Sequence, residues 1–153
     1  MRAAGNRMRV FFLQFIKGQW KSGEREILHS IPNVELAVTG KGFIIEGLRD
    51  PRIPMEVHQD AAAAGWLYVK RLLEEDAYDM IVLDEILGAV KADLISLDEL
   101  LQVIRAKPAR LHLVLTGRGA PAELIELADL VSEVRPIKHP FEQGIKAQRG
   151  IEF

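Results

Sequence analysis

Two acidic residues at the end of a short apolar run are the first candidates for chemistry. Residues Tyr78–Glu85 read YDMIVLDE, in which four apolar residues precede Asp84 and Glu85. The pattern is that of a Walker B segment, in which a buried strand fixes carboxylates at the edge of a sheet. Mg²⁺ prefers oxygen ligands and keeps several waters, so one or two carboxylates can hold a Mg²⁺–phosphate complex. The alternative is a buried strand whose acidic end is solvated or caps the next helix, and the pattern alone leaves both interpretations open.

Two further segments carry groups that suit phosphate. Thr116–Gly119 reads TGRG, in which the glycines allow close backbone approach and Arg118 can bind phosphate oxygens through two N–H groups. Lys17 follows another apolar run, within FIKG at residues 15–18. Taken alone, each segment is better explained as a strand-to-helix turn with an exposed arginine or as an ordinary surface lysine.

Other kinds of site find no support in the residue spacing. The four histidines, His29, His58, His112 and His139, show no metal-ligand spacing. The serines lie in no GxSxG motif, and the absence of cysteine excludes a thiolate nucleophile or a cysteine metal site. No GxxxxGK[ST] phosphate loop is present, since Gly40-Lys41-Gly42 lacks the following Ser or Thr. The residues by themselves therefore indicate an α/β domain that could bind a nucleotide.

The segments that must position these groups alternate between strand and helix. Apolar runs bounded by turn residues predict strands at 9–15, 34–38, 79–83, 111–115 and 130–134. Helical spacing of apolar residues, a Ser96–Glu99 capping box and Pro121 predict helices at 24–30, 55–76, 97–106 and from 121 onward. A short extended piece is expected at 43–45. This alternation predicts an α/β fold with a largely parallel sheet flanked by helices, and ligands bind such sheets outside the carboxyl ends of the strands.

Composition limits the class of protein. The chain has 153 residues, 48% of them hydrophobic and 27% charged, with a net charge of −2, which is typical of one soluble globular domain. We therefore expect a single domain over 1–153. The near-neutral charge argues against general nucleic-acid binding. No apolar run approaches the roughly 18–20 residues of a membrane span, and the lack of cysteine fits a reducing cytoplasm.

Taken together, these motifs resemble the P-loop-type ATP:corrinoid adenosyltransferases over essentially the whole chain. The matching segments occur in the family's order and are Arg2–Gly18, Gly23–Arg25, Gly40–Phe43, Tyr78–Glu85, Leu115–Val134 and Lys138–Phe153. The resemblance implies a RecA-like P-loop NTPase fold. It also implies transfer of the 5′-deoxyadenosyl group of ATP to cob(I)alamin or cob(I)yrinic acid a,c-diamide, with release of triphosphate, in adenosylcobalamin synthesis or salvage.

The same resemblance implies roles for individual residues and partners. Glu85 coordinates Mg²⁺ with Asp84 in support, and the residues facing the nucleotide are Arg2, Lys17, Thr116 and Arg118. Phe43 and Ile45 lie against the corrinoid, where Ile45 stands at a position that is often Trp in the family. The tail Lys138–Phe153 closes the nucleotide side. A reductant or flavoprotein supplies cob(I), and the protein is a cytoplasmic homodimer that binds neither nucleic acid nor membrane.

One departure from the family pattern lies at the start of the sequence. Family members have a strand, a GxxxxGK[ST] loop and most of a helix before the counterpart of Arg2–Gly5. We therefore expect about 25–30 residues to be absent, through a late start codon or a truncated gene product. Strands beside a lost strand would show unpaired apolar edges. An inactive remnant and another ATPase with a similar sheet remain alternatives.

Overall fold

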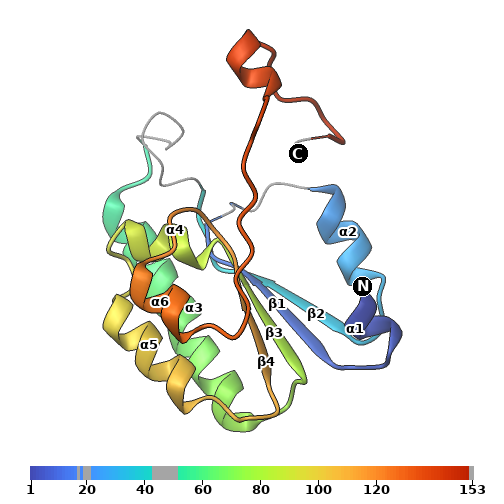
Figure 1. Cartoon of the computed structure of the whole chain (residues 1–153), viewed down its shortest axis with the longest axis vertical. Helices are drawn as coiled ribbons and strands as arrows, with labels where there is room; N and C mark the ends of the chain where they lie inside the picture. The colour runs from blue at the N-terminus through green and yellow to red at the C-terminus, as the bar shows by residue number, and fades with distance from the viewer. Residues whose placement is uncertain (17, 19–21, 43–51, 152–153) are drawn as a thin grey trace.

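Four parallel strands form the centre of the molecule (Figure 1). A computed structural model describes the chain except for residues 17, 19–21, 43–51 and 152–153. The strands are β1 (Val10–Gln14), β2 (Val34–Val38), β3 (Met80–Asp84) and β4 (His112–Leu115), in the spatial order β2-β1-β3-β4. Every pair is parallel, which confirms the predicted α/β class and four of the predicted strands to within two residues at each end.

The two central strands set the register of the sheet. Phe11 lies opposite Ile81 and Leu13 opposite Leu83, and all four side chains are buried. Burying one side chain of this size stabilises the fold by about 1.5–3 kcal/mol. The same register brings Gln14, the last residue of β1, opposite Asp84, the last residue of β3. The apolar core thereby determines which polar residues meet at the carboxyl edge.

Helices cover one face of the sheet and stand beside its β2 edge (Figure 1). The covering helices are α3 (Met55–Glu75), α4 (Ile86–Lys91), α5 (Leu97–Ala106) and α6 (Ala122–Leu127). Beside β2 lie α1 (Arg2–Gly5) and α2 (Gly23–His29), and the tail contains the 3₁₀ turn η1 (Pro140–Gln143). Ser96 caps α5 as predicted, because its Oγ accepts a hydrogen bond from the Glu99 backbone N–H. Pro121 precedes α6 as its cap residue instead of lying in its first turn.

The predicted fifth strand at 130–134 is wrong. In this segment Leu130 is 84% exposed and Val134 is 94% exposed, and neither belongs to a strand. The two valines of this segment favour a strand, but a strand also needs a neighbour for its backbone groups. After α6 the chain instead leaves the body and projects beyond the carboxyl edge of the sheet (Figure 1). The tail from residue 129 to 151 is exposed throughout, and its closure over the nucleotide stays a prediction.

The described sheet is continuous. Both β1 and β3 are paired on their two sides, which leaves β2 and β4 as the only edge strands among the described residues. Backbone hydrogen bonds from His112 N to Asp79 O, before β3, and from Thr116 N to Leu83 O, after β4, extend the β3–β4 pairing at both ends. The unpaired apolar edges expected inside the sheet are therefore not found in this part of the chain.

No helix in the described ranges has both the length and the apolar character needed to cross a membrane.

A close contact between α3 and the end of β2 supports the carboxyl edge. A Cβ atom placed on Gly65 of α3 would lie 2.7 Å from Thr39 Oγ1 and 2.9 Å from Thr39 Cγ2. Thr39 in turn donates its backbone N–H to Gln14 O at 3.1 Å. The absence of a side chain at Gly65 therefore lets the helix approach the residue that continues β2 toward Gln14.

We expect Gly65→Ala to destabilise the protein, although alanine usually stabilises a helix relative to glycine by about 1 kcal/mol. Crowding against the stiff, β-branched Thr39 should cost about 1–3 kcal/mol. Chemical denaturation of Gly65→Ala in the parent and in a Thr39→Ala background measures this. The background removes the two nearest atoms and leaves Thr39 Cβ at 3.0 Å, so there the same change should cost clearly less. Equal effects in the two backgrounds would contradict the contact.

Candidate active site

The carboxylate of Asp84 is held from two sides at the end of β3. Its Oδ1 accepts a hydrogen bond from Thr116 Oγ1 at 2.9 Å, and its Oδ2 accepts one from Gln14 Nε2 at 3.2 Å. Gln14 ends β1 and Thr116 directly follows β4, so groups from three neighbouring strands meet on one side chain. With a donor on each oxygen, the Asp84 carboxylate has a fixed orientation.

Glu85 differs from its neighbour in backbone and side chain. Its φ of 61° is left-handed, a conformation that costs a non-glycine residue about 1–2 kcal/mol. The chain turns here from β3 into α4, and the Glu85 backbone N–H donates to Thr116 Oγ1 at 3.0 Å. Within the described part of the chain, no hydrogen bond or ion pair reaches the Glu85 carboxylate. A strained acidic residue with an unpaired carboxylate at a strand end indicates a functional position.

Thr116 links the two acidic residues. Its hydroxyl donates to Asp84 and accepts from the Glu85 backbone, and its carbonyl accepts from the Leu87 N–H at 3.3 Å. The structure therefore brings predicted site residue Thr116 together with Asp84 and Glu85. Its hydroxyl is already engaged, and two N–H groups at the start of α4 are bonded to Thr116 instead of pointing to an open anion site.

The loop after Thr116 lies directly on the first turn of α4. Gly117 has a φ of 138°, and a Cβ there would lie 2.7 Å from Leu87 Cβ and 3.3 Å from Gly88 N. Arg118 comes next and is exposed, with no hydrogen bond or ion pair to any residue that the structure describes. The loop thus holds a guanidinium two residues from the Thr116 hydroxyl and leaves it open to solvent.

Gln14 and Arg25 complete the cluster, and residue spacing did not point to either. The Gln14 side chain is 1% exposed, and its Oε1 accepts from Arg25 Nε at 2.6 Å. Arg25, from α2, also donates through Nη2 to Gly18 O at 2.8 Å. An amide that ends the otherwise apolar strand VFFLQ is the signal that could have identified Gln14.

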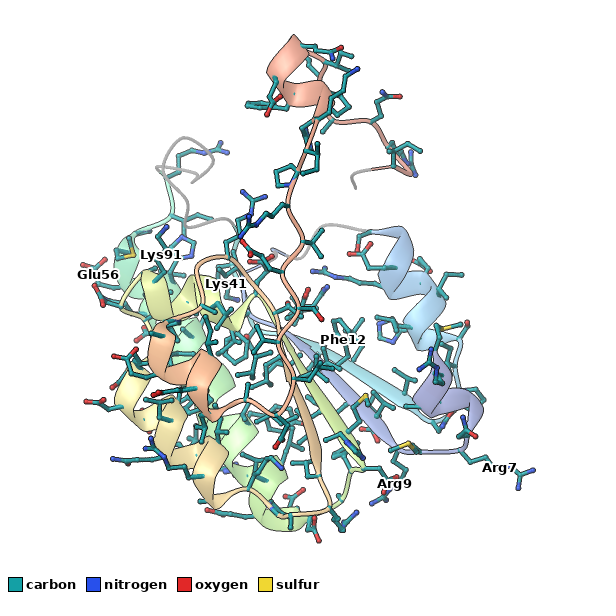
Figure 2. All side chains as sticks on the ribbon, viewed as in Figure 1. Arg7, Arg9, Phe12, Lys41, Glu56 and Lys91 are labelled. Atoms are coloured by element: carbon teal, nitrogen blue, oxygen red, sulfur yellow. The ribbon has the colours of Figure 1, made fainter. Side chains whose placement is uncertain are left out.

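The other predicted residues are not brought to this cluster. Lys17, Phe43 and Ile45 lie outside the described residues. Arg2 belongs to α1. The side-chain amide of Asn33, next to the start of β2, donates to the Ala4 and Met8 carbonyls and so holds α1 beside the start of β1 and β2. Arg2 therefore lies at the edge opposite Asp84. In Figure 2, Lys41 lies at the carboxyl edge of the sheet, whereas Arg7 and Arg9 lie at the amino edge.

The donor set at the carboxyl edge suits Mg²⁺. It offers carboxylate oxygens, and Mg²⁺ is commonly bound by one or two carboxylates together with waters and substrate phosphates. In the described ranges no group of three or more His, Cys, Asp or Glu side chains could hold a metal by itself. Glu85, whose carboxylate is unpaired, fits the role of ligand better than Asp84, whose oxygens are hydrogen-bonded.

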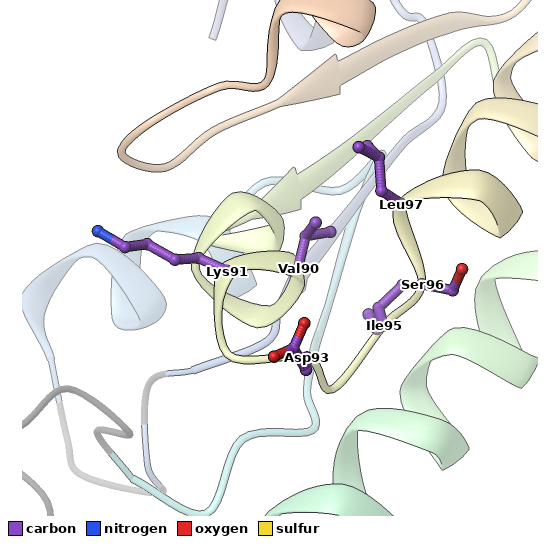
Figure 3. Close-up of a pocket in the computed structure, with 6 residues that line it drawn as sticks. All are labelled: Val90, Lys91, Asp93, Ile95, Ser96 and Leu97. Carbon is purple, nitrogen blue, oxygen red and sulfur yellow. The ribbon is translucent and has the colours of Figure 1, made fainter.

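A depression elsewhere on the molecule is not part of this cluster. It has a volume of about 540 Å³ and lies between α4 and α5, lined by Val90, Lys91, Asp93, Ile95, Ser96 and Leu97 (Figure 3). The Lys91 side chain points away from the other five (Figure 3). The polar side chains that line the depression, Lys91, Asp93 and Ser96, do not point toward one common position (Figure 3), so the carboxyl edge remains the candidate site.

Comparison with known proteins decides the family. The model of the ATP:corrinoid adenosyltransferase BtuR/CobO/CobP family matches residues 1–153. The chain belongs to this family. It is 40% identical over 152 residues to corrinoid adenosyltransferase CobA of Salmonella typhimurium. The aligned region covers 99% of this chain and 74% of that protein. Corrinoid adenosyltransferases of Escherichia coli K12 and Pseudomonas aeruginosa are 38% and 40% identical, covering 99% of this chain and 74% and 73% of theirs. The predicted family and its enzymatic class are thus confirmed.

In this adenosyltransferase, we expect Gly117→Ala to disturb the site more than Gly119→Ala. Both glycines have positive φ, but a Cβ at Gly119 would meet no atom within 4 Å, whereas at Gly117 it would strike Leu87. Gly119→Ala should cost about 1–2 kcal/mol from backbone strain alone. Gly117→Ala should cost at least about 1 kcal/mol more, because backbone atoms of α4 must shift. Urea denaturation of both variants measures the difference, and equal losses would contradict the packing of the loop on α4.

Proposed function

We propose that this chain transfers the 5′-deoxyadenosyl group of ATP to cob(I)alamin or cob(I)yrinic acid a,c-diamide and releases triphosphate. The observation that carries the proposal is the division between Asp84 and Glu85 at the carboxyl edge. One carboxylate is fixed by hydrogen bonds and the other is unpaired beside it. In a chain of this family, that arrangement is suited to a Mg²⁺–nucleotide complex.

The reaction needs no nucleophile from the protein. The cob(I) electron pair attacks the 5′ carbon of ATP, so a cobalt–carbon bond forms while the bond from that carbon to the triphosphate oxygen breaks. Triphosphate leaves with the electrons of that bond. The protein therefore has to orient the ribose carbon toward cobalt and to stabilise negative charge on the leaving group.

The residues of the carboxyl edge divide these tasks. Glu85 would hold Mg²⁺ and Asp84 would support it, and Mg²⁺ bound there would supply positive charge to the triphosphate. The exposed guanidinium of Arg118 suits phosphate oxygens, because its planar N–H groups can bind two of them. We assign Thr116 to positioning both acidic residues. Lys17 and Arg2 as nucleotide contacts stay predictions from the family resemblance.

The corrinoid side and the partners also rest on that resemblance. We propose that Phe43 and Ile45 contact the corrinoid and that Ile45 replaces an aromatic residue that helps to displace the lower axial ligand of cobalt. We further propose that a separate reductant or flavoprotein supplies cob(I), that the working form is a homodimer and that the reaction takes place in the cytoplasm.

Replacement of Glu85 tests the reaction and its metal. We expect Glu85→Ala to lower the rate of Mg²⁺-dependent corrinoid adenosylation at least tenfold, about 1.4 kcal/mol, because the unpaired carboxylate at the metal position is removed. The measurement is formation of adenosylated corrinoid from ATP and chemically reduced cob(I)alamin. Glu126→Ala, at an exposed position on α6, is the matched control and should leave the rate unchanged.

A Glu85→Ala rate within twofold of the parent would contradict the metal assignment. A parent chain that hydrolyses ATP without adenosylating corrinoid would contradict the proposed function and favour another type of ATPase. A parent chain that does neither would make it an inactive member of the family.

Replacement of Ile45 tests the corrinoid side. If an aromatic residue at this position helps to displace the lower ligand, Ile45→Trp should raise the four-coordinate fraction of bound cob(II)alamin. Electronic spectra of cob(II)alamin with ATP and each protein measure this fraction, and Ile45→Leu is the control of similar volume. An unchanged spectrum in an Ile45→Trp protein that binds corrinoid would contradict the assignment.

A further inference from the structure

We propose that Gln14 is a positioning residue of the active site, whose buried amide connects Arg25 to Asp84 and so leaves Glu85 as the metal ligand. The inference rests on the proposed function, because it assigns how the two carboxylates divide their roles. The family resemblance implied no role for Gln14 or for Arg25.

The chemistry of its two neighbours allows Gln14 only one amide orientation. Arg25 offers N–H donors and no acceptor, whereas an ionised Asp84 offers acceptors and no donor. The carbonyl oxygen of the amide must therefore face Arg25, at 2.6 Å, and the NH₂ group must face Asp84, at 3.2 Å. Rotating the amide by half a turn would place donor against donor and acceptor against acceptor. Arg25 thus selects the orientation in which Gln14 donates to Asp84.

Burial makes this connection expensive to lose. Gln14 is almost fully enclosed, so water cannot readily take its place between the two charged groups. With Gln14 and Thr116 each donating to one oxygen, Asp84 is satisfied within the protein. A carboxylate whose oxygens already accept hydrogen bonds is a poorer metal ligand than an unpaired one. Without the Gln14 donor, the Asp84 carboxylate could rotate away from Thr116, and the Thr116 hydroxyl would no longer hold the turn that places Glu85 at the metal position.

The connection also reaches the loop after β1. The same Arg25 guanidinium that holds Gln14 donates to Gly18 O, next to Lys17 in the chain. Arg25 lies in the first turn of α2. It belongs to Gly23–Arg25, one of the segments that match the family pattern. The position of α2 and of Gly18 is therefore tied, through one amide, to the orientation of Asp84.

Two Gln14 variants separate this role from simple packing. Gln14→Leu removes both hydrogen bonds, whereas Gln14→Glu retains an acceptor for Arg25 but loses the donor toward Asp84. In the presence of ATP, we expect both to weaken Mn²⁺ binding at least fivefold, measured by water-proton relaxation on the 153-residue chain. They should lower kcat for adenosylation at least tenfold while the KM for ATP changes less than threefold. Gln102→Leu, at an exposed position on α5, is the control and should change neither.

A measurement made without metal tests the hydrogen bonds of the Gln14 amide directly. In the ¹⁵N-labelled chain, the side-chain amide protons of Gln14 should exchange slowly with solvent, and their signals should shift on Asp84→Asn. Should Gln14→Leu fail to fold, Arg25→Met serves as the second variant. It keeps the amide but removes the group that selects its orientation, and it should weaken Mn²⁺ binding two- to fivefold.

The possible failures can be told apart. If the parent binds Mn²⁺ through Glu85 and the folded Gln14 or Arg25 variants bind it equally well, the inference is overturned and the proposed function stands. Gln14 variants with lowered thermal stability but unchanged Mn²⁺ affinity would likewise overturn it, since the amide would then serve packing alone. If Glu85→Ala does not weaken Mn²⁺ binding by the parent, the proposed metal site fails and the inference fails with it.

Discussion

The carboxyl edge of the sheet depends on the hydrogen bonds that converge on Asp84. Its side chain accepts from Thr116 and Gln14, and its backbone carbonyl accepts from Phe15 N at 3.1 Å. Three strands can supply these groups only because their apolar residues fix one register. A slip of one residue would move Gln14 to the other face of the sheet and take its amide away from Asp84. The buried residues of β1 and β3 therefore determine the polar geometry at their ends.

Much of this arrangement could be predicted from local sequence, because local sequence carries periodicity and end signals. The run MIVL before Asp84 identified β3, strand 34–38 was placed without error, and Ser96 marked the start of α5. The carboxyl-edge rule then brought Asp84, Glu85 and the loop at Thr116 to the same place. The family resemblance supplied the chemistry that these patterns left open, and the family match over residues 1–153 confirms the family itself.

The rest depends on contacts between residues distant in sequence. Asp84 lies 70 residues from Gln14 and Arg25 lies 11 residues from it, and no spacing rule joins the three. Thr116 was expected to face the nucleotide, yet its hydroxyl is used within the protein, which only the pairing of β3 with β4 reveals. The segment 130–134 shows the converse, because its apolar residues favour a strand but do not say whether a partner strand is present. Its exposed Leu130 and Val134 follow from the lack of such a partner in the described chain.

Two adjacent carboxylates acquire different surroundings here because the chain leaves the strand between them. In a strand, side chains alternate between faces, so residue 85 would follow Ile81 and Leu83 onto the buried face. The left-handed backbone at Glu85 ends that alternation and starts α4, and the Thr116 hydroxyl holds the Glu85 N–H in the strained turn. The conformational cost of the turn is thus opposed by the same hydroxyl that immobilises Asp84. One threonine stabilises the geometry that keeps one carboxylate bound within the protein and its neighbour unpaired.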